Sequence, residues 1–119
     1  MSLKNVVVQG YQTQESMVLE PTPIYVDTVD PNMSVDNKSA VMGISVSING
    51  LDGSGSVYVG NGNITGSAQF CTENGIPLVL EGDSVNIVCS VTSSTGLPLP
   101  SVTINCKISS AGQSVVKAE

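Results

Sequence analysis

The sequence lacks several residue types on which enzymes and nucleic-acid-binding proteins depend. It has no histidine, arginine or tryptophan, and only 3% of its residues are aromatic. Without histidine, a serine or cysteine nucleophile lacks its usual base, and the familiar histidine-containing zinc sites of hydrolases are excluded. Four lysines against ten acidic residues give a net charge of −6, which disfavours nucleic acid because phosphates are bound by basic side chains. We expect a protein that is not an enzyme and binds no nucleic acid.

Long apolar runs are missing as well. No run approaches the ~20 residues needed to cross a bilayer. The stretch from Met1 to Asn5 is not followed by the long apolar segment of a signal peptide. We therefore expect a soluble protein made in a host cytoplasm without a signal peptide. Charged residues make up only 12% of the chain and aromatic residues only 3%. The core must therefore be built from valine, isoleucine, leucine and alanine.

Glycine and proline, by contrast, are frequent. Twelve glycines and six prolines place a turn signal every few residues, and valine and isoleucine dominate the segments between them. This combination favours an all-β fold over a helical or a disordered one. At 119 residues the chain has the length of a single domain with one modest core.

Within this domain, 1–119, we expect two parts. Residues 1–42 contain an N-terminal strand at 4–10 and an acidic, proline-containing segment, which we expect to be a solvated excursion with a strand only at 23–26. Residues 43–119 form a body of repeated hairpins. Apolar residues alternate with polar ones along its strands, which we expect at 44–48, 56–59, 85–91, 102–108 and 113–117.

The body is organised around the stretch 75–85. Gly75 and Pro77 open a short apolar run, and Gly82 with Asp83 closes it in a turn that can hydrogen-bond its own backbone. Elsewhere the segment 45–49 recurs in similar form at 101–105. This repetition is either a coincidence of short β sequences or a sign of two or three strand-turn-strand units packed around a shared axis.

The three cysteines are the only candidate site. Their odd number argues against a closed disulfide framework, and Cys71, Cys89 and Cys106 are 18 and 17 residues apart. If each comes from an equivalent place in successive units, three thiolates could hold one zinc or iron ion. Alternatively, Cys89 and Cys106 pack in the core as small hydrophobes. Cys71, which shares its face with Gln69 and Glu73, fits core packing least well.

Two resemblances bear on the fold. The segment 82–91 resembles the second strand of an immunoglobulin domain, but no tryptophan follows it and Cys106 comes too soon for the partner strand. We treat this first resemblance as a coincidence. Another β-sandwich, such as a virion decoration or adhesion module, remains the alternative.

The second resemblance is to the PAAR-like proteins. The stretch from Gly75 to Asp83 resembles the recurring Gly-x-Pro-Val-x-x-x-Gly-Asp turn of that family. Residues 55–62 resemble the strand and Asn-Gly turn that usually precede it, and residues 110–119 resemble the ending of small phage members. The chain departs from the family in two respects. It lacks the Pro-Ala-Ala-Arg tetrapeptide, and it lacks the histidine that the family's tip metal usually takes along with cysteine.

The resemblance implies a small cone of short β-hairpins with pseudo-threefold repetition. Such a cone forms the sharp tip of a membrane-piercing central spike in a phage tail baseplate, a pyocin or a type VI secretion apparatus. One chain would cap a homotrimeric β-helical spike protein by covering its open strand edges. The apex would contact the target cell envelope, and the expected location is the virion tail tip. An all-cysteine zinc or iron site, or no metal, is compatible with the departures.

Overall fold

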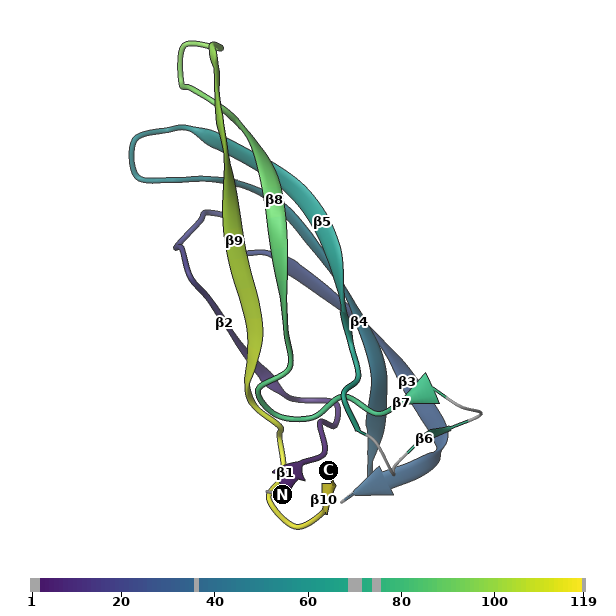
Figure 1. Ribbon diagram of the computed structural model, residues 1–119. Helices are drawn as coiled ribbons and strands as arrows, with labels where there is room; N and C mark the ends of the chain where they lie inside the picture. Colours follow the sequence, from purple (N-terminus) through teal and green to yellow (C-terminus); the bar gives the residue numbers. More distant parts are fainter. Residues whose placement is uncertain (1–2, 36, 69–71, 74–75, 119) are drawn as a thin grey trace.

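The computed structural model describes residues 3–35, 37–68, 72–73 and 76–118, which form β-strands and no helix (Figure 1). The all-β prediction is confirmed. None of the described residues belongs to a helix of the length and apolarity that a membrane crossing needs. The strands are β1 (Lys4–Asn5), β2 (Gln12–Glu15), β3 (Ile24–Val35), β4 (Lys38–Leu51), β5 (Val57–Thr65), β6 (Thr72–Glu73), β7 (Ile76–Pro77), β8 (Ser84–Thr92), β9 (Pro98–Ser110) and β10 (Lys117–Ala118).

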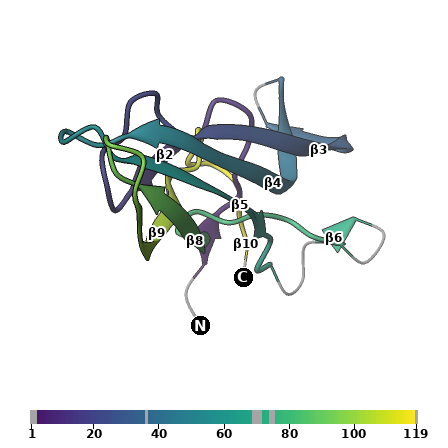
Figure 2. The same cartoon turned by 90° about the horizontal axis from the view of Figure 1, so that it is seen from above.

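Six of these strands form one antiparallel sheet in the order β2-β9-β8-β5-β4-β3, which curls into a half-barrel (Figure 2). Two two-stranded ladders, β1 with β10 and β6 with β7, lie at the base of the molecule (Figure 1). The body measures 49 × 25 × 23 Å. Its hairpins are longer than the short ones we expected, because β4 has 14 residues and β9 has 13.

The half-barrel consists of three units of similar topology. Each unit contains a short buried segment and two strands, and each neighbouring pair of units is joined by a ladder: β3 with β4, β5 with β8, and β9 with β2. The buried segments are 6–8, 40–41 and 78–80; the first precedes β2 and β3, the second lies near the start of β4, and the third precedes β8 and β9. The units differ in length, because β2 has only four residues. The three buried segments and the three ladders thus give the half-barrel a threefold arrangement.

The three segments meet in a closed ring of backbone hydrogen bonds. The Val7 N–H donates to the Val79 carbonyl, the Val79 N–H to the Val41 carbonyl, and the Val41 N–H to the Val7 carbonyl, each over 2.9 Å. All three valines are fully buried. Since a buried, unpaired amide is costly, the ring satisfies polar groups that no ordinary ladder reaches at the point where three units converge.

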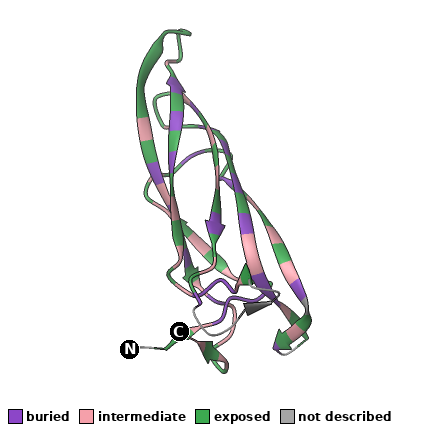
Figure 3. Cartoon of the chain, turned by 45° about the vertical axis from the view of Figure 1, so that its right-hand side comes forward, coloured by how far each residue is buried: buried purple, intermediate pink, exposed green. Residues whose placement is uncertain are grey.

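Successive side chains of the ring segments belong to different parts of the apolar interior, which forms two clusters. The ring valines belong to the main core between the strands, whereas residues beside them belong to a second cluster at the base. The main core also includes the predicted apolar face of β4, while the serines between those residues are exposed. Buried and exposed residues alternate in the same way along the long strands (Figure 3). The second cluster consists of Val6, Ala40, Ala68, Leu78 and Leu80.

The curl of the sheet depends on glycines of β5. This strand pairs with β8 only over Val57–Val59 and Ser90–Thr92. Below that ladder, a Cβ on Gly60 would lie 2.9 Å from Ile87 Cγ2, and one on Gly62 would lie 3.0 Å from Ile87 Cγ1. Because these two glycines have no side chain, Ile87 can pack directly against the backbone of β5.

The acidic segment differs from our expectation. Residues 24–35 form β3 rather than a solvated excursion, and β3 pairs with β4. The ladder is irregular between Val29 and Ser34, where Asp30 is buried and accepts a hydrogen bond from the Asn32 N–H at 2.8 Å. This local bond offers the backbone a partner where the ladder is interrupted, so an acidic, proline-containing sequence can still form an edge strand.

Candidate functional site

The predicted turn motif locks the third segment of the ring. Gly75 lies outside the described residues, and Pro77 belongs to β7. Gly82 has φ of +95°, which favours glycine, and its N–H donates to the Ile108 carbonyl at 2.9 Å. The Asp83 carboxylate accepts hydrogen bonds from the Leu80 N–H at 2.8 Å and from the N–H and hydroxyl of Ser67. The motif therefore joins the ring to β8, β9 and the segment after β5.

The described cysteines lie in one unit, not in successive units. Cys89 is in β8 and Cys106 is in β9 of the same hairpin. The ring valines, 34 and 38 residues apart, give the true repeat length, so the cysteine spacing does not report it. The similar segments 45–49 and 101–105 are not equivalent either, because one lies in the first strand of its unit and the other in the second.

The strand register keeps the two thiols apart. Cys106 is opposite Val85 and Cys89 is opposite Val102, so they are separated by four ladder positions, or roughly 13 Å of strand. Two sulfurs on one zinc ion lie within about 5 Å of each other, given bonds of about 2.3 Å. This pair does not fit a shared ion, and no metal-binding group of three histidine, cysteine or acidic side chains occurs within the described ranges. Cys71 lies outside those ranges.

Both described thiols have the environment of core residues. Cys89 and Cys106 are fully buried in the main core, and burial raises the pKa of each thiol. A raised pKa lowers the fraction of thiolate, which is the form that binds metals and attacks electrophiles. The placement of these two residues matches the core-packing alternative.

One unit is open, and tyrosines bridge it. The strands β2 and β3 are the two edges of the sheet. The Tyr25 hydroxyl donates to Glu15 Oε2 at 2.7 Å, and the Tyr11 hydroxyl donates to Asp27 Oδ1 at 3.2 Å. Burial is the largest cause that raises the pKa of both phenols, and the neighbouring carboxylates raise it further. We call these two contacts the tyrosine seam, because they take the place of a backbone ladder.

Sequence reasoning did not find the tyrosine seam. All four of its residues lie in the segment that was interpreted as a solvated excursion. The signal available was the presence of two of only three tyrosines in a segment otherwise dominated by acids and prolines. Large aromatic side chains seldom remain fully exposed when their hydroxyl groups can reach a carboxylate.

The opposite end of the molecule is formed by the hairpin loops, and the β8–β9 loop reaches furthest (Figure 1). Leu97 and Leu99 are 64% and 42% exposed there, and Pro98 and Pro100 are exposed beside them. The sequence contains no charged residue from Ser84 to Cys106. We call residues 97–100 the apolar tip. Four consecutive exposed apolar residues on a hairpin are typical of a contact surface rather than of a solvated turn.

The neighbouring β4–β5 loop carries one charge, and that charge is held by the loop itself. Asp52 Oδ1 accepts hydrogen bonds from the Ser54 N–H at 2.9 Å, the Ser54 hydroxyl and the Ser56 N–H, and Oδ2 accepts one from the Tyr58 hydroxyl at 2.8 Å. These hydrogen bonds, with Ser54 first, lower the pKa of Asp52 to about 2. The carboxylate is therefore a structural part of the turn.

Comparison with known proteins identifies no relative. Neither protein-family models, curated proteins nor solved structures give a match to this chain.

Proposed function

We propose that this protein is a non-enzymatic structural protein that forms the tip of a membrane-piercing central spike, as the resemblance to PAAR-like proteins implies. It would cap a homotrimeric β-helical spike in a phage tail baseplate or a related contractile injection machine, with one chain per trimer. The observation that carries the proposal is the ring of Val7, Val41 and Val79, in which one chain repeats its topology three times around an axis. A chain with a threefold arrangement can present similar contacts to each subunit of a threefold partner.

One of the stretches that carry the resemblance lies at this ring. The stretch 75–83 contains the third ring segment and the turn that Asp83 locks to it. The elongated body and the apolar tip support the same proposal, because the β8–β9 hairpin carries no charged residue from Ser84 to Cys106 and can enter an apolar environment at low cost in desolvation. Contact of this end with the target cell envelope is part of the proposal.

The proposal is tested by locating the chain in purified tail particles. Immuno-electron microscopy with antibodies against this chain should label the distal end of the tail, and quantitative mass spectrometry should find one copy for every three copies of the spike protein. Absence of the chain from the particles, or a ratio of three to three, would contradict the capping role.

A virion decoration or adhesion module is the second candidate. It is favoured by the continuous main core between the two sides of the curled sheet, a feature that a β-sandwich shares. In the same experiment a decoration protein should label the capsid or the tail sheath in many copies, and an adhesion module should label the fibres. The position of the label therefore separates the two functions.

A further inference from the structure

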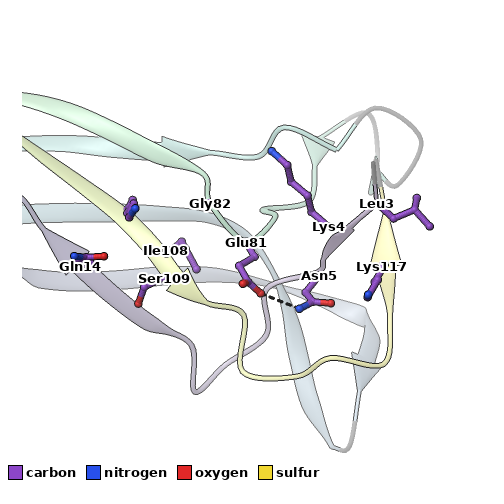
Figure 4. Close-up of a pocket in the computed structure, with 10 residues that line it drawn as sticks. Leu3, Lys4, Asn5, Gln14, Glu81, Gly82, Ile108, Ser109 and Lys117 are labelled. Atoms are coloured by element: carbon purple, nitrogen blue, oxygen red, sulfur yellow. Dashed lines mark hydrogen bonds between the residues drawn. The ribbon is translucent and has the colours of Figure 1, made fainter. Parts of the chain in front are cut away.

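Three of the four lysines of the chain line one hollow at the base of the molecule. Lys4 comes from β1, Lys107 from β9 and Lys117 from β10, so the hollow joins residues from both ends of the sequence. Its volume is about 450 Å³. Figure 4 shows Lys4 and Lys117 near the hydrogen-bonded pair Asn5 and Glu81, with Gln14 and Ser109 further along the hollow.

The three ammonium groups have no hydrogen-bond or ion-pair partner among the residues that the structure describes. Among the described residues of the lining, Glu81 is the only acidic one, and its Oε2 accepts a hydrogen bond from Asn5 Nδ2 at 2.8 Å. The described lining thus carries more positive than negative charge, in a chain whose net charge is −6.

From this arrangement we infer that the hollow binds a carboxylate group of an acidic partner segment. Ammonium groups act as point charges and attract an anion without the planar fork that arginine offers. The Gln14 amide and the Ser109 hydroxyl supply further hydrogen-bond donors in the lining. Glu81 repels a dianion more strongly than a monoanion, which favours a carboxylate over phosphate.

The charge of the rest of the molecule limits the partner further. With a net charge of −6, the protein repels extended polyanions, whose many charges act within about a Debye length of its surface. A single acidic side chain, or a short acidic segment, meets only the local positive potential of the hollow. The inference does not rest on the proposed function, because an anion site at the base would exist in a spike tip and in an adhesion module.

The chain provides a matched control for the test. Lys38, the fourth lysine, does not line the hollow, and its Nζ donates to the Gly112 carbonyl at 3.4 Å. The variants Lys107→Gln and Lys38→Gln change the net charge equally, so a difference between them reports the hollow and not the overall charge. Thermal melting of each variant establishes that it is folded.

The experiment is a titration of the full chain with N-acetylated triglutamate, followed by backbone amide NMR. The largest shifts should occur at residues of the hollow, and Lys107→Gln should weaken binding about fivefold, the size of one charge pair at ~4 Å in water. Lys38→Gln should bind as the parent does. The proposal is overturned by an absence of shifts in the hollow, by equal weakening in both variants, or by tighter binding of inorganic phosphate than of triglutamate.

Discussion

The two ends of the molecule are stabilised in different ways. At the base, backbone hydrogen bonds of the valine ring, the second apolar cluster and the Asp83 turn hold three chain segments together. At the hairpin end, the β4–β5 loop is held by its own turn, as Asp52 shows, and the apolar tip projects into solvent. Stability is therefore concentrated at the base, while the hairpin end is free to vary its contact residues.

The largest expected difference between the two ends is in the free energy of unfolding when a leucine is replaced by alanine at each end. Leu80 is 2% exposed in the basal cluster, whereas Leu97 is 64% exposed at the apolar tip. Leu80→Ala should lower the free energy of unfolding by about 2–5 kcal/mol because it leaves a cavity. Leu97→Ala should change it by less than about 0.5 kcal/mol. Denaturant unfolding measures both, and equal effects would abolish the distinction between the ends.

A glycine pair gives the next largest effect. A Cβ on Gly66 would lie 2.2 Å from the Pro77 carbonyl oxygen and 2.5 Å from that of Leu78, whereas a Cβ on Gly53 meets no atom within 4 Å. Gly66→Ala should cost about 1–3 kcal/mol, because the ring segment must shift to relieve the overlap. Gly53→Ala in the β4–β5 loop should be close to neutral, and thermal melting of the two variants should place them far apart.

The tyrosine seam can be tested at alkaline pH. Tyr25→Phe should cost about 1 kcal/mol at neutral pH, because Glu15 loses its hydrogen-bond donor. The pKa of Tyr25 is raised in the folded protein, so its contribution is complete below the unfolded value of about 10 and declines as the pH rises above it. The difference between parent and variant should therefore shrink in unfolding curves recorded above pH ~10, and a constant difference would contradict the seam.

The smallest effect is expected in the β4–β5 loop at acid pH. The pKa of Asp52 is lowered to about 2, so its stabilising contribution is present above the unfolded value of about 3.9 and is lost as the pH falls towards 2. Asp52→Asn should melt slightly below the parent at pH 5 and together with it at pH 2. Parallel melting curves at both pH values would show that the hydrogen bonds of the loop contribute nothing.

The sequence predicted the parts of the fold that local patterns determine. The alternation at 44–48, the strands at 85–91 and 102–108 and the turn at Gly82 and Asp83 lie where they were expected. A half-buried strand and a glycine turn each require only a few adjacent residues. Whether the segments 45–49 and 101–105 repeat by coincidence was left open by the sequence, and the structure shows that the two segments are not equivalent.

The remaining features depend on residues that are distant in sequence. The start of β3 was predicted as a strand at 23–26, but its continuation to Val35 was missed because Asp30 and Pro31 suggested a solvated segment. The ladder with β4 tolerates an irregularity there. The basal hollow joins Lys4 with Lys107 and Lys117, and no local pattern relates them. The ring was missed for the same reason, since three single valines in apolar stretches carry no sign that their amides will pair with one another.

The ring and the basal ladder also have a consequence for the order of folding. The hairpins β4–β5 and β8–β9 join residues close in sequence, whereas β1 pairs Lys4 with Ala118 and the ring joins Val7, Val41 and Val79. Contacts of such long sequence separation require large loops to close, which slows their formation. We expect the two hairpins to form early and the ring to form late. The most stable end of the finished molecule would then be the last to be assembled.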